Sequence, residues 1–369
     1  MPSTTTTSPL QTSLAKRFGL RAPIFGFAHD IATVAAITNA GGLGVYGATR
    51  RFPNEIRDEL AEIRRLVGDK PFGVDLVLPQ GMPEHNDRAE IEKHIPDEHR
   101  AFVQGMVEKY EVPAPSGPGM RTRFVRSAEI EAEQLAAVMA SDVDLFACGI
   151  GAPKAAVEQA HELGKATAAL IGSPRHVRSA LAAGVEIIVA QGTEAGAHTG
   201  KIGTFSLVPQ IVDLAGDVPV LAAGGVATGR HLAAALALGA EGVWTGTMWL
   251  TTTEHAPHLG PTLVAKLLAA GSDDTVIQRS ESGKTMRMIR TAWSDEWAAP
   301  DAPEPLKMPY QDILVGDLLG AISEHNVEPL VHSPAGQALG QLNELKPAAQ
   351  LIDELIDEAS SAFGRLGGN

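Results

Sequence analysis

Short apolar runs alternate with helix-like segments along most of this chain. The alternation is clearest from residue 127 to residue 247, where each apolar run is followed by a polar or glycine-rich turn and then by a helical spacing of apolar residues. Alternation of this kind is typical of βαβ units, which build a parallel sheet. We count three such strands before residue 79 and five after residue 125. Eight strands at this spacing predict an α/β fold, a (β/α)8 TIM barrel.

A doubly wound sheet is the alternative α/β architecture. That fold usually carries Gly-x-Gly-x-x-Gly after its first strand, and this fingerprint is missing here, where the sequence reads Gly26-Phe27-Ala28-His29. We therefore favour the barrel. Its strands are expected at Pro23–Ala28, Leu43–Tyr46, Phe72–Leu78, Val143–Cys148, Lys165–Ile171, Glu186–Ala190, Val218–Ala222 and Gly242–Thr245.

The alternation also predicts how the chain is divided. The barrel is expected to occupy residues 16–260, interrupted at 79–125 by a polar, proline-bearing insertion that is helical over Pro96–Tyr110. Residues 1–15, rich in Ser and Thr, are expected to form a disordered tail, with a first turn around Leu14 at its end. Residues 261–369 are interpreted as the last barrel helix plus an appended C-terminal helical cap. The helix-like segments there are Pro261–Ala270, Tyr310–Ile322, Pro334–Leu342 and Pro347–Phe363.

Charge and cysteine content exclude several classes of partner. The net charge of −14 at pH 7 argues against nucleic acid and against an anionic membrane surface. The single cysteine, Cys148, excludes an internal disulfide and a cysteine metal cluster, and it fits a reducing compartment. No apolar run approaches the roughly 20 residues of a membrane span, and the N-terminus lacks the features of a signal peptide. We expect a cytoplasmic globular protein.

The stretch from Val189 to Gly200 is the strongest candidate for a functional loop. An apolar run opens there into a loop with glycines at 192, 196 and 200, and the loop carries His198. Glycine lets the backbone lie close to a ligand, and the ordinary pKa of histidine lies near neutral pH. Catalytic groups of barrel enzymes sit on the loops that follow the strands. The stretch is therefore predicted to be a functional loop, with a plain strand-to-helix turn as the alternative.

Small residues follow the last two predicted strands. Ala223-Gly224-Gly225 comes after the seventh strand, and Thr245-Gly246-Thr247 comes after the eighth. In TIM barrels these two loops commonly bind phosphate, together with a helix N-terminus. The helix expected to begin near Thr228 would supply its positive end. The pair predicts a phosphate-bearing ligand, with structural turns as the alternative.

Other polar residues near strand ends have two interpretations each. Gln191 ends the sixth strand and can hydrogen-bond toward the barrel mouth, whereas Asp75 is an acid within an apolar strand. Asp75 either binds a polar ring edge or is a solvated side chain, and His29 either contacts a ligand or lies in a surface loop. Cys148 has no partner base nearby in the sequence, so we interpret it as a core residue rather than a nucleophile.

The insertion contains three histidines that invite a metal interpretation. His85, His94 and His99 are spaced nine and five residues apart, and neither spacing matches an i,i+4 pair of ligands. We expect these side chains to lie on a solvated surface and predict no metal site.

With these residues placed, the sequence resembles the nitronate monooxygenase family, formerly called 2-nitropropane dioxygenases. Its most specific motif is Ala-Gln-Gly-x-Glu-Ala-Gly-x-His-x-Gly. Members of this family are FMN-dependent (β/α)8 enzymes that oxidise alkyl nitronates with O2 to a carbonyl compound and nitrite. The resemblance implies the same fold, cofactor and reaction for this chain. It spans about Arg17 to Trp293 and is carried by the segments Asn39–Gly44, Lys70–Leu76, Ala190–Gly200, Ala222–Val226 and Thr245–Thr247.

The resemblance also implies roles for individual residues. His198 would stand near the reactive edge of the flavin as the catalytic residue. A neutral imidazole there suits removal of the α-proton of a nitroalkane, and its protonated form suits a nitronate's charge. The residues implied to bind FMN are Asp75, Gln191, Gly196, Gly224, Gly225, Trp244, Thr245, Gly246 and Thr247.

The chain departs from the family pattern at three places near the implied site. Asp75 stands where the family usually has Asn, so it would donate to the flavin ring only when protonated. Ala197 replaces a common glycine, and the loop after the first strand lacks the usual Pro-Met. These departures, with the insertion, leave the substrate open.

Competing functions follow from the same motif. The first is oxidation of a small-molecule nitronate with O2. The second is an FMN-dependent NAD(P)H reductase, because the flavin-dependent enoyl-acyl-carrier-protein reductases share the Gly-x-Glu-x-Gly-x-His loop. A non-catalytic flavin-binding protein is the third. The sequence leaves open whether the chain forms a homodimer.

Overall fold

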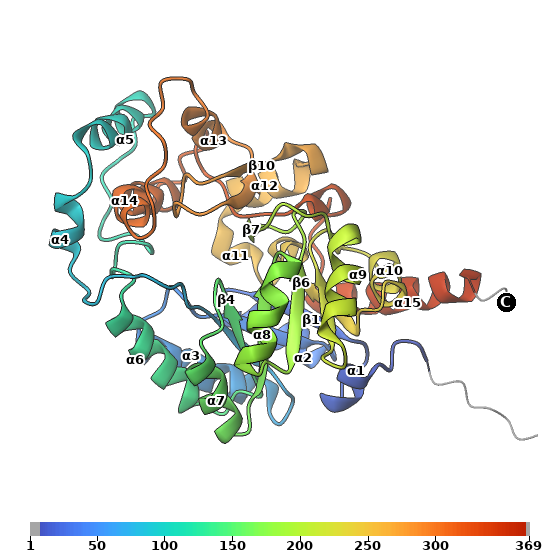
Figure 1. Ribbon diagram of the computed structural model, residues 1–369. Helices are drawn as coiled ribbons and strands as arrows, with labels where there is room; N and C mark the ends of the chain where they lie inside the picture. Colours follow the sequence, from blue (N-terminus) through green and yellow to red (C-terminus); the bar gives the residue numbers. More distant parts are fainter. Residues whose placement is uncertain (1–7, 367–369) are drawn as a thin grey trace, which may run out of the picture.

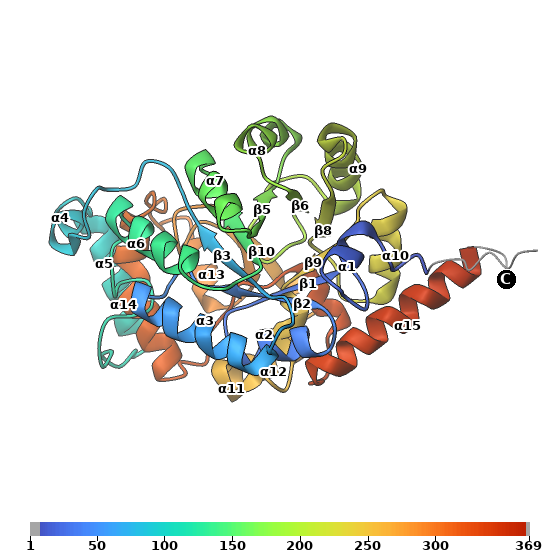
Figure 2. The same ribbon diagram turned by 90° about the horizontal axis from the view of Figure 1, so that it is seen from below.

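A computed structural model describes residues 8–366 of the chain. Eight parallel strands form a closed barrel in the order β1-β2-β3-β4-β5-β6-β8-β9, which Figure 2 shows ringed by helices. The predicted (β/α)8 barrel is confirmed, and each strand lies within two residues of its predicted start and end. The strands are β1 (Ile24–Ala28), β2 (Leu43–Gly47), β3 (Gly73–Val77), β4 (Leu145–Gly149), β5 (Ala166–Ile171), β6 (Ile187–Gln191), β8 (Val220–Ala223) and β9 (Gly242–Thr245).

Alternation along the strands separates two apolar layers. Side chains such as Phe25 and Val189 point into the barrel and pack together there. Their neighbours Ile24 and Ile188 point outward and pack beneath the helices. Asp75 is in register with Ala147 of β4, a member of the interior layer. The period of two residues therefore places the Asp75 carboxyl group inside the barrel.

Helices cover the outside of the barrel, and the ring is closed by the last helix of the chain. The helix α15 packs against both α10 and α2 and runs along the barrel beside α10 (Figure 1). The segment expected at Pro261–Ala270 forms α12 (Pro261–Ala269). It is not the last helix of the ring around the barrel, because α15 has that position. The surrounding helices are α2 (Ile31–Asn39), α3 (Pro53–Val67), α6 (Ala128–Met139), α7 (Lys154–Glu162), α8 (Val177–Ala183), α9 (Thr204–Ala215), α10 (Gly229–Ala237) and α15 (Ala348–Leu366).

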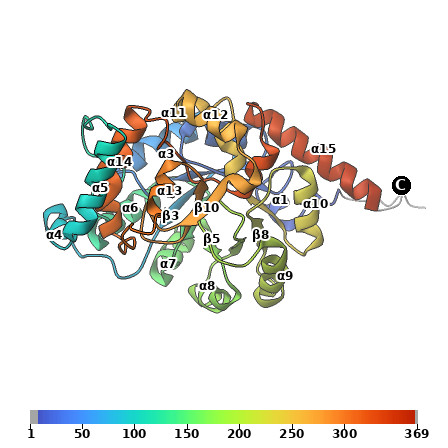
Figure 3. The same cartoon turned by 90° about the horizontal axis from the view of Figure 1, so that it is seen from above.

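Two excursions from the barrel meet above one end of it. The insertion forms α4 (Arg88–Lys93) and α5 (Asp97–Lys109), and both helices pack against α14 (Tyr310–Glu324), as Figure 3 shows from above. The second excursion lies between β9 and α15. Its other elements are η2 (Thr247–Thr251), α11 (Ala256–Leu259), α12, η3 (Ser272–Asp274), β10 (Thr275–Gln278), β11 (Met286–Ile289), α13 (Ala292–Trp297) and η4 (Gln337–Gln341).

A small antiparallel sheet, which the sequence did not predict, joins the second excursion to the central loop. Its order is β10-β11-β7, and β7 (Ala197–His198) comes from that loop. His198 pairs with Met286, and Ala197 pairs with Arg287. Only two residues of the central loop, Ala197 and His198, adopt strand conformation. Their pairing with β11 therefore fixes the position of His198.

The helix expected over Pro334–Leu342 is wrong. Only the short 3₁₀ helix η4 forms there. The N–H of Gly336 donates to Oγ1 of Thr247, and the N–H of Gln337 donates to the carbonyl of Glu194. Tertiary hydrogen bonds to the barrel loops thus replace the helical bonds that local spacing favours.

The disordered tail is wrong over residues 8–12, whereas the turn expected around Leu14 agrees with the helix found there; residues 1–7 lie outside the described residues. Leu10, Leu14 and Ala15 are buried, and α1 (Ser13–Arg17) begins with Thr12 as its N-cap. Leu14 packs against the interior layer of the barrel beside Phe25. This helix therefore closes one end of the barrel.

We expect Leu14→Ala to lower the free energy of unfolding by about 2–5 kcal/mol, because it removes a buried side chain and leaves a cavity. Denaturation in urea measures the loss. Leu66 is 38% exposed, so Leu66→Ala is a matched control with a change within about 0.5 kcal/mol. Equal effects of the two substitutions would contradict the role given to α1.

Among residues 8–366, no helix combines the length and the apolar character that a membrane crossing requires.

Candidate active site

A cavity of about 1250 Å³ opens at the carboxyl ends of the barrel strands. It is lined by segments that follow all eight barrel strands and by the second excursion, including Lys284 and Ser333. The structure thus brings every predicted site residue to one cavity. Those residues are His29, Asp75, Gln191, Gly196, His198, Gly224, Gly225, Trp244, Thr245, Gly246 and Thr247.

His198 lines this cavity, and one of its ring nitrogens has a hydrogen-bond partner. Its Nδ1 lies 3.3 Å from the carbonyl oxygen of Thr285, and because a carbonyl only accepts hydrogen bonds, the Nδ1–H donates. The neutral ring then carries a lone pair on Nε2. No hydrogen bond within the described part of the chain involves Nε2 of His198. The arrangement leaves this nitrogen free to accept a proton from a bound molecule.

The expectation that His198 titrates near neutral pH is wrong. Burial lowers the pKa of His198 to about 4, and the hydrogen bond to Thr285 only partly opposes this effect. At pH 7 the ring is therefore neutral, and its full population is available as a base.

The central loop is held by its own polar residues. The side-chain amide of Gln191 donates to the carbonyl of His198 at 2.9 Å. The carboxylate of Glu194 accepts hydrogen bonds from the N–H and the hydroxyl of Thr204, each at 2.8 Å. A Cβ on Gly196 would lie 2.8 Å from the backbone of Gly336. Glycine is thus required at position 196 because the second excursion packs against the loop.

The two small-residue loops form a cradle with free donors. Gly224 and Gly225 have φ angles of 97° and 77°, which favour glycine. No hydrogen bond among residues 8–366 uses the N–H groups of Gly224, Gly225 or Gly246, and a Cβ on Gly246 would meet no atom within 4 Å. Thr247 Oγ1 accepts from Gly336 at 2.9 Å, which leaves its hydroxyl hydrogen free to donate. Donors and space of this kind fit a phosphate group.

The predicted help from the α10 N-terminus is wrong. The N–H of Gly229, the first residue of α10, donates to the carboxylate of Glu358 at 2.9 Å. The N–H groups of Ala227 and Thr228 donate to Nδ1 of His231. Because α15 supplies its own anion there, the positive end of α10 is already neutralised.

Two other residues implied to bind the cofactor differ in what they offer. Trp244 points into the barrel and stacks on Phe27, with ring centroids 6.2 Å apart. The hydroxyl of Thr245 donates to the carbonyl of Phe25 and accepts from Nε1 of Trp249. Only the backbone of Thr245 is thus available to a ligand.

Asp75 is a buried acid with an unsatisfied oxygen. It is 5% exposed, and Oδ2 has no hydrogen-bond partner among residues 8–366. Burial raises the pKa of Asp75 to about 7, although Arg126 opposes the shift. The interpretation as a solvated strand-end residue is therefore wrong. A buried polar atom without a partner at a cavity wall fits the polar edge of a bound ring.

Other residues considered from the sequence have mostly structural roles. Cys148 is free and buried, as expected for a core residue, and burial raises the pKa of its thiol. His85 and His94 are exposed, but His99 is buried and its Nε2–H donates to the carbonyl of Glu304, so its predicted solvation is wrong. Within residues 8–366, no group of three or more potential metal ligands is found.

The sequence interpretation missed a set of buried charges beside the cavity. Arg50, Arg121 and Arg126 line it, and Arg121 pairs with Glu281 and Asp312. These residues come from the loop after β2, the insertion and the second excursion. No local spacing connects them, so no signal in the sequence identifies them as one group.

Comparison with known proteins places these features in a family. The family model described as "Nitronate monooxygenase" matches residues 8–358. A Mycobacterium tuberculosis protein named "Putative monooxygenase Rv1533" is 41% identical over 374 residues, covering 97% of this chain and 99% of that protein.

Two solved structures are similar to this chain over almost its whole length. A nitroalkane oxidase from Streptomyces ansochromogenes is similar with a TM-score of 0.79 and 28% identity, over 96% of this chain and 99% of that one. FabK from Thermotoga maritima is similar with a TM-score of 0.74 and 26% identity, over 97% of this chain and 99% of that one.

Proposed function

The chain belongs to the nitronate monooxygenase family of flavin-dependent oxidoreductases, and on this basis we propose that it binds FMN and oxidises alkyl nitronates with O2. The products would be a carbonyl compound and nitrite, and a related carbanion-like substrate is included. One observation carries the proposal. A neutral His198, whose Nε2 makes no hydrogen bond among residues 8–366, lines the same cavity as Gly224 and Gly246 with their unbonded N–H groups.

The residues present fit FMN at both of its polar ends. Gly224, Gly225, Gly246 and Thr247 would hold the phosphate, since they offer donors and open space. Asp75 would meet a polar edge of the ring, because its Oδ2 lacks a partner. Bound there, the flavin supplies the electron acceptor for the oxidation.

The chain itself supplies proton transfer and orientation. His198 Nε2 would remove the α-proton of a neutral nitroalkane, which leaves the nitronate. The imidazolium then bears a positive charge beside the negative nitronate oxygens and stabilises them. Thr285 keeps the ring oriented through its carbonyl, and Gln191 holds the backbone of His198 in place.

The cavity lining favours a second candidate, flavin reduction by NAD(P)H. Arg175, His176, Lys201 and Lys284 bring basic side chains to the cavity, and such side chains suit the phosphates of a dinucleotide.

An anaerobic titration followed at flavin wavelengths tests both candidates. An alkyl nitronate is added to one sample and NADPH or NADH to another, and nitrite is assayed after air is admitted. Flavin reduction by the nitronate, with nitrite formed on aeration, is the expected result. Rapid reduction by the nicotinamide alone would move the protein to the reductase class. Absence of nitrite from a protein with its flavin intact would overturn the first candidate.

Asp75 predicts a pH dependence of stability. Its pKa is about 7 in the folded chain, against an ordinary value of 3.8, so the folded state keeps a proton that the unfolded chain has lost. Stability then falls as pH rises from about 4 to 7. At about 1.4 kcal/mol per pH unit, the loss has an upper limit of about 4 kcal/mol.

Asp75→Asn removes this titration, so we expect the variant to gain stability relative to the natural chain as pH rises from 4 to 8. Urea denaturation of the flavin-free proteins at pH 4, 6 and 8 measures the difference. A constant difference across this range would mean that Asp75 is not protonated in the folded state.

A further inference from the structure

A buried carboxylate lies behind the carbonyl that orients His198. We propose that Glu281 is a positioning residue, which fixes the loop 280–285 and so holds the Thr285 carbonyl against Nδ1 of His198. The catalytic importance of this contact rests on the proposed function, whereas the contact itself does not. Glu281 is separated from Thr285 by only three residues, and both belong to the turn that connects β10 to β11.

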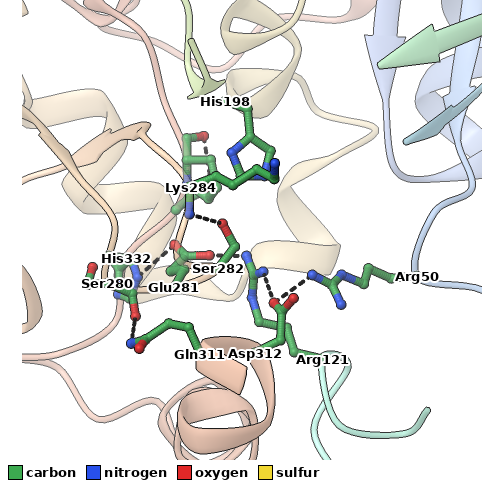
Figure 4. A network of polar contacts seen from close by, with 12 residues as sticks. Arg50, Arg121, His198, Ser280, Glu281, Ser282, Lys284, Gln311, Asp312 and His332 are labelled. Atoms are coloured by element: carbon green, nitrogen blue, oxygen red, sulfur yellow. Dashed lines mark hydrogen bonds and ion pairs between the residues drawn. The ribbon is translucent and has the colours of Figure 1, made fainter. Parts of the chain in front are cut away.

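Glu281 is held from two directions. Arg121 of the insertion pairs with its Oε2, and Nε2–H of His332 donates to its Oε1 at 3.0 Å. The side chains of Glu281 and His332 are only 5% and 4% exposed. His332 is itself fixed by stacking on Trp293, with ring centroids 5.3 Å apart. Figure 4 shows Arg121, Glu281 and His332 close together below His198.

The same network reaches the barrel. Asp312 of α14 accepts from Arg121 at 2.8 Å and from Arg50 at 2.7 Å. Arg50 follows β2, so barrel, insertion and second excursion meet at one set of buried charges. Burial alone would raise the pKa of Glu281, but Arg121 and His332 hold it at about 2. The carboxylate is therefore ionised, and the network stays intact across the pH range in which most enzymes work.

The start of the loop has separate supports. Gln311 donates to the carbonyl of Ser280 at 2.7 Å, and Nε1 of Trp293 donates to its hydroxyl at 3.0 Å. These bonds hold residue 280 without involving Glu281. Loss of the Glu281 charge should thus shift the loop between residues 281 and 285 and leave the surrounding fold in place.

The consequence for His198 is a choice of tautomer. With the Thr285 carbonyl in position, the proton stays on Nδ1, and Nε2 keeps its lone pair toward the cavity. If the carbonyl moves away, the hydrogen bond that favours the Nδ1–H tautomer of the neutral ring is lost. The charged groups nearest the ring, Arg121, Asp312 and Glu281, come from three different segments. Removal of Glu281 leaves the positive charge of Arg121 less compensated, which keeps the ring neutral in the variant.

Nitrogen-15 NMR of the holoenzyme labelled at histidine tests the proposal directly, with His198→Asn used to assign the signal. The natural chain is expected to show His198 protonated at Nδ1 at pH 7. In Glu281→Gln, which is isosteric, we expect a mixture of the two tautomers. An unchanged Nδ1–H tautomer in this variant would overturn the proposal.

Kinetics provide a second readout that a purely structural effect would not give. Glu281→Gln is expected to lower kcat/KM about tenfold for a neutral nitroalkane, which needs a proton removed. For the preformed nitronate the loss should be less than about threefold, because no base is required. Glu281→Asp keeps the charge and should recover part of the loss. If the natural chain oxidises neither the nitroalkane nor the nitronate, the proposed function fails, and the NMR result still decides the positioning role.

A matched variant tests whether removal of a carboxylate elsewhere also changes the His198 tautomer. Glu59 accepts hydrogen bonds from Arg51 and Tyr46 and does not line the cavity, so Glu59→Gln should leave the His198 tautomer unchanged. If Glu281→Gln does not fold, His332→Gln removes one of the two contacts of the same carboxylate. A His198 tautomer unchanged in His332→Gln would then overturn the proposal.

Discussion

Replacement of His198 by asparagine is expected to lower kcat/KM for a neutral nitroalkane by about 10²–10⁴-fold, the usual contribution of a positioned general base. Asparagine keeps a donor for the Thr285 carbonyl but offers no basic nitrogen. Steady-state rates measured as nitrite release check the prediction. Because burial lowers the pKa of His198 to about 4, the natural enzyme should keep its kcat/KM down to about pH 4–5 instead of losing it below pH 6.5.

The substrate distinguishes this role from a general loss of the site. A preformed nitronate needs no base, so His198→Asn should retain most of its activity toward it. Flavin content should also remain unchanged. His94 is exposed in the insertion, and His94→Asn is a control that should alter neither activity. Equal losses for the nitroalkane and the nitronate would mean that His198 does not act as the base.

Gly246→Leu is expected to raise the Kd for FMN by about 10²–10⁴-fold. The leucine side chain would fill the open space beside Gly246 and displace the phosphate from its donors. Loss of two hydrogen bonds to a charged group, at about 1.5–3 kcal/mol each, corresponds to this range because about 1.4 kcal/mol changes Kd tenfold. Fluorescence titration of the flavin-free protein with FMN measures the affinity.

The fold should tolerate this substitution. Gly246 has a φ angle of −131°, outside the left-handed region, and an added Cβ meets no atom within 4 Å. We therefore expect little change in thermal stability. Gly117, in the insertion, has the same free space and does not line the cavity, so Gly117→Leu is the control. Normal FMN affinity in Gly246→Leu would place the phosphate elsewhere.

Local pattern was sufficient for most of the barrel. Buried parallel strands appear in the sequence as apolar runs, and the helices between them have N-cap residues at their starts and glycines at their C-terminal ends. Pattern was not sufficient where tertiary contacts override it. The segment from Pro334 hydrogen-bonds to Thr247 and Glu194 instead of forming an α-helix. Residues 8–15 are ordered because Leu14 packs into the end of the barrel.

The site divides in the same way. Parallel strands end at one face of a barrel, so Asp75 in β3, Gln191 at the end of β6 and Gly224 after β8 could be predicted to lie toward the same face. The free N–H groups of the cradle are likewise consistent with the small residues found there. By contrast, the α10 N-terminus seemed available from its sequence alone. It is neutralised by Glu358, more than 100 residues away along the chain.

The sequence by itself therefore determined the barrel, the face that carries the candidate site and the presence of His198 in a loop at that face, because each depends on residues close together in the chain. Tertiary structure alone decided the chemical state of that site. The low pKa of His198, the protonation of Asp75 and the buried contacts of Arg121 with Glu281 depend on desolvation and on charges from distant segments. Burial and Coulomb interactions act through space, and a linear spacing of residues does not encode them.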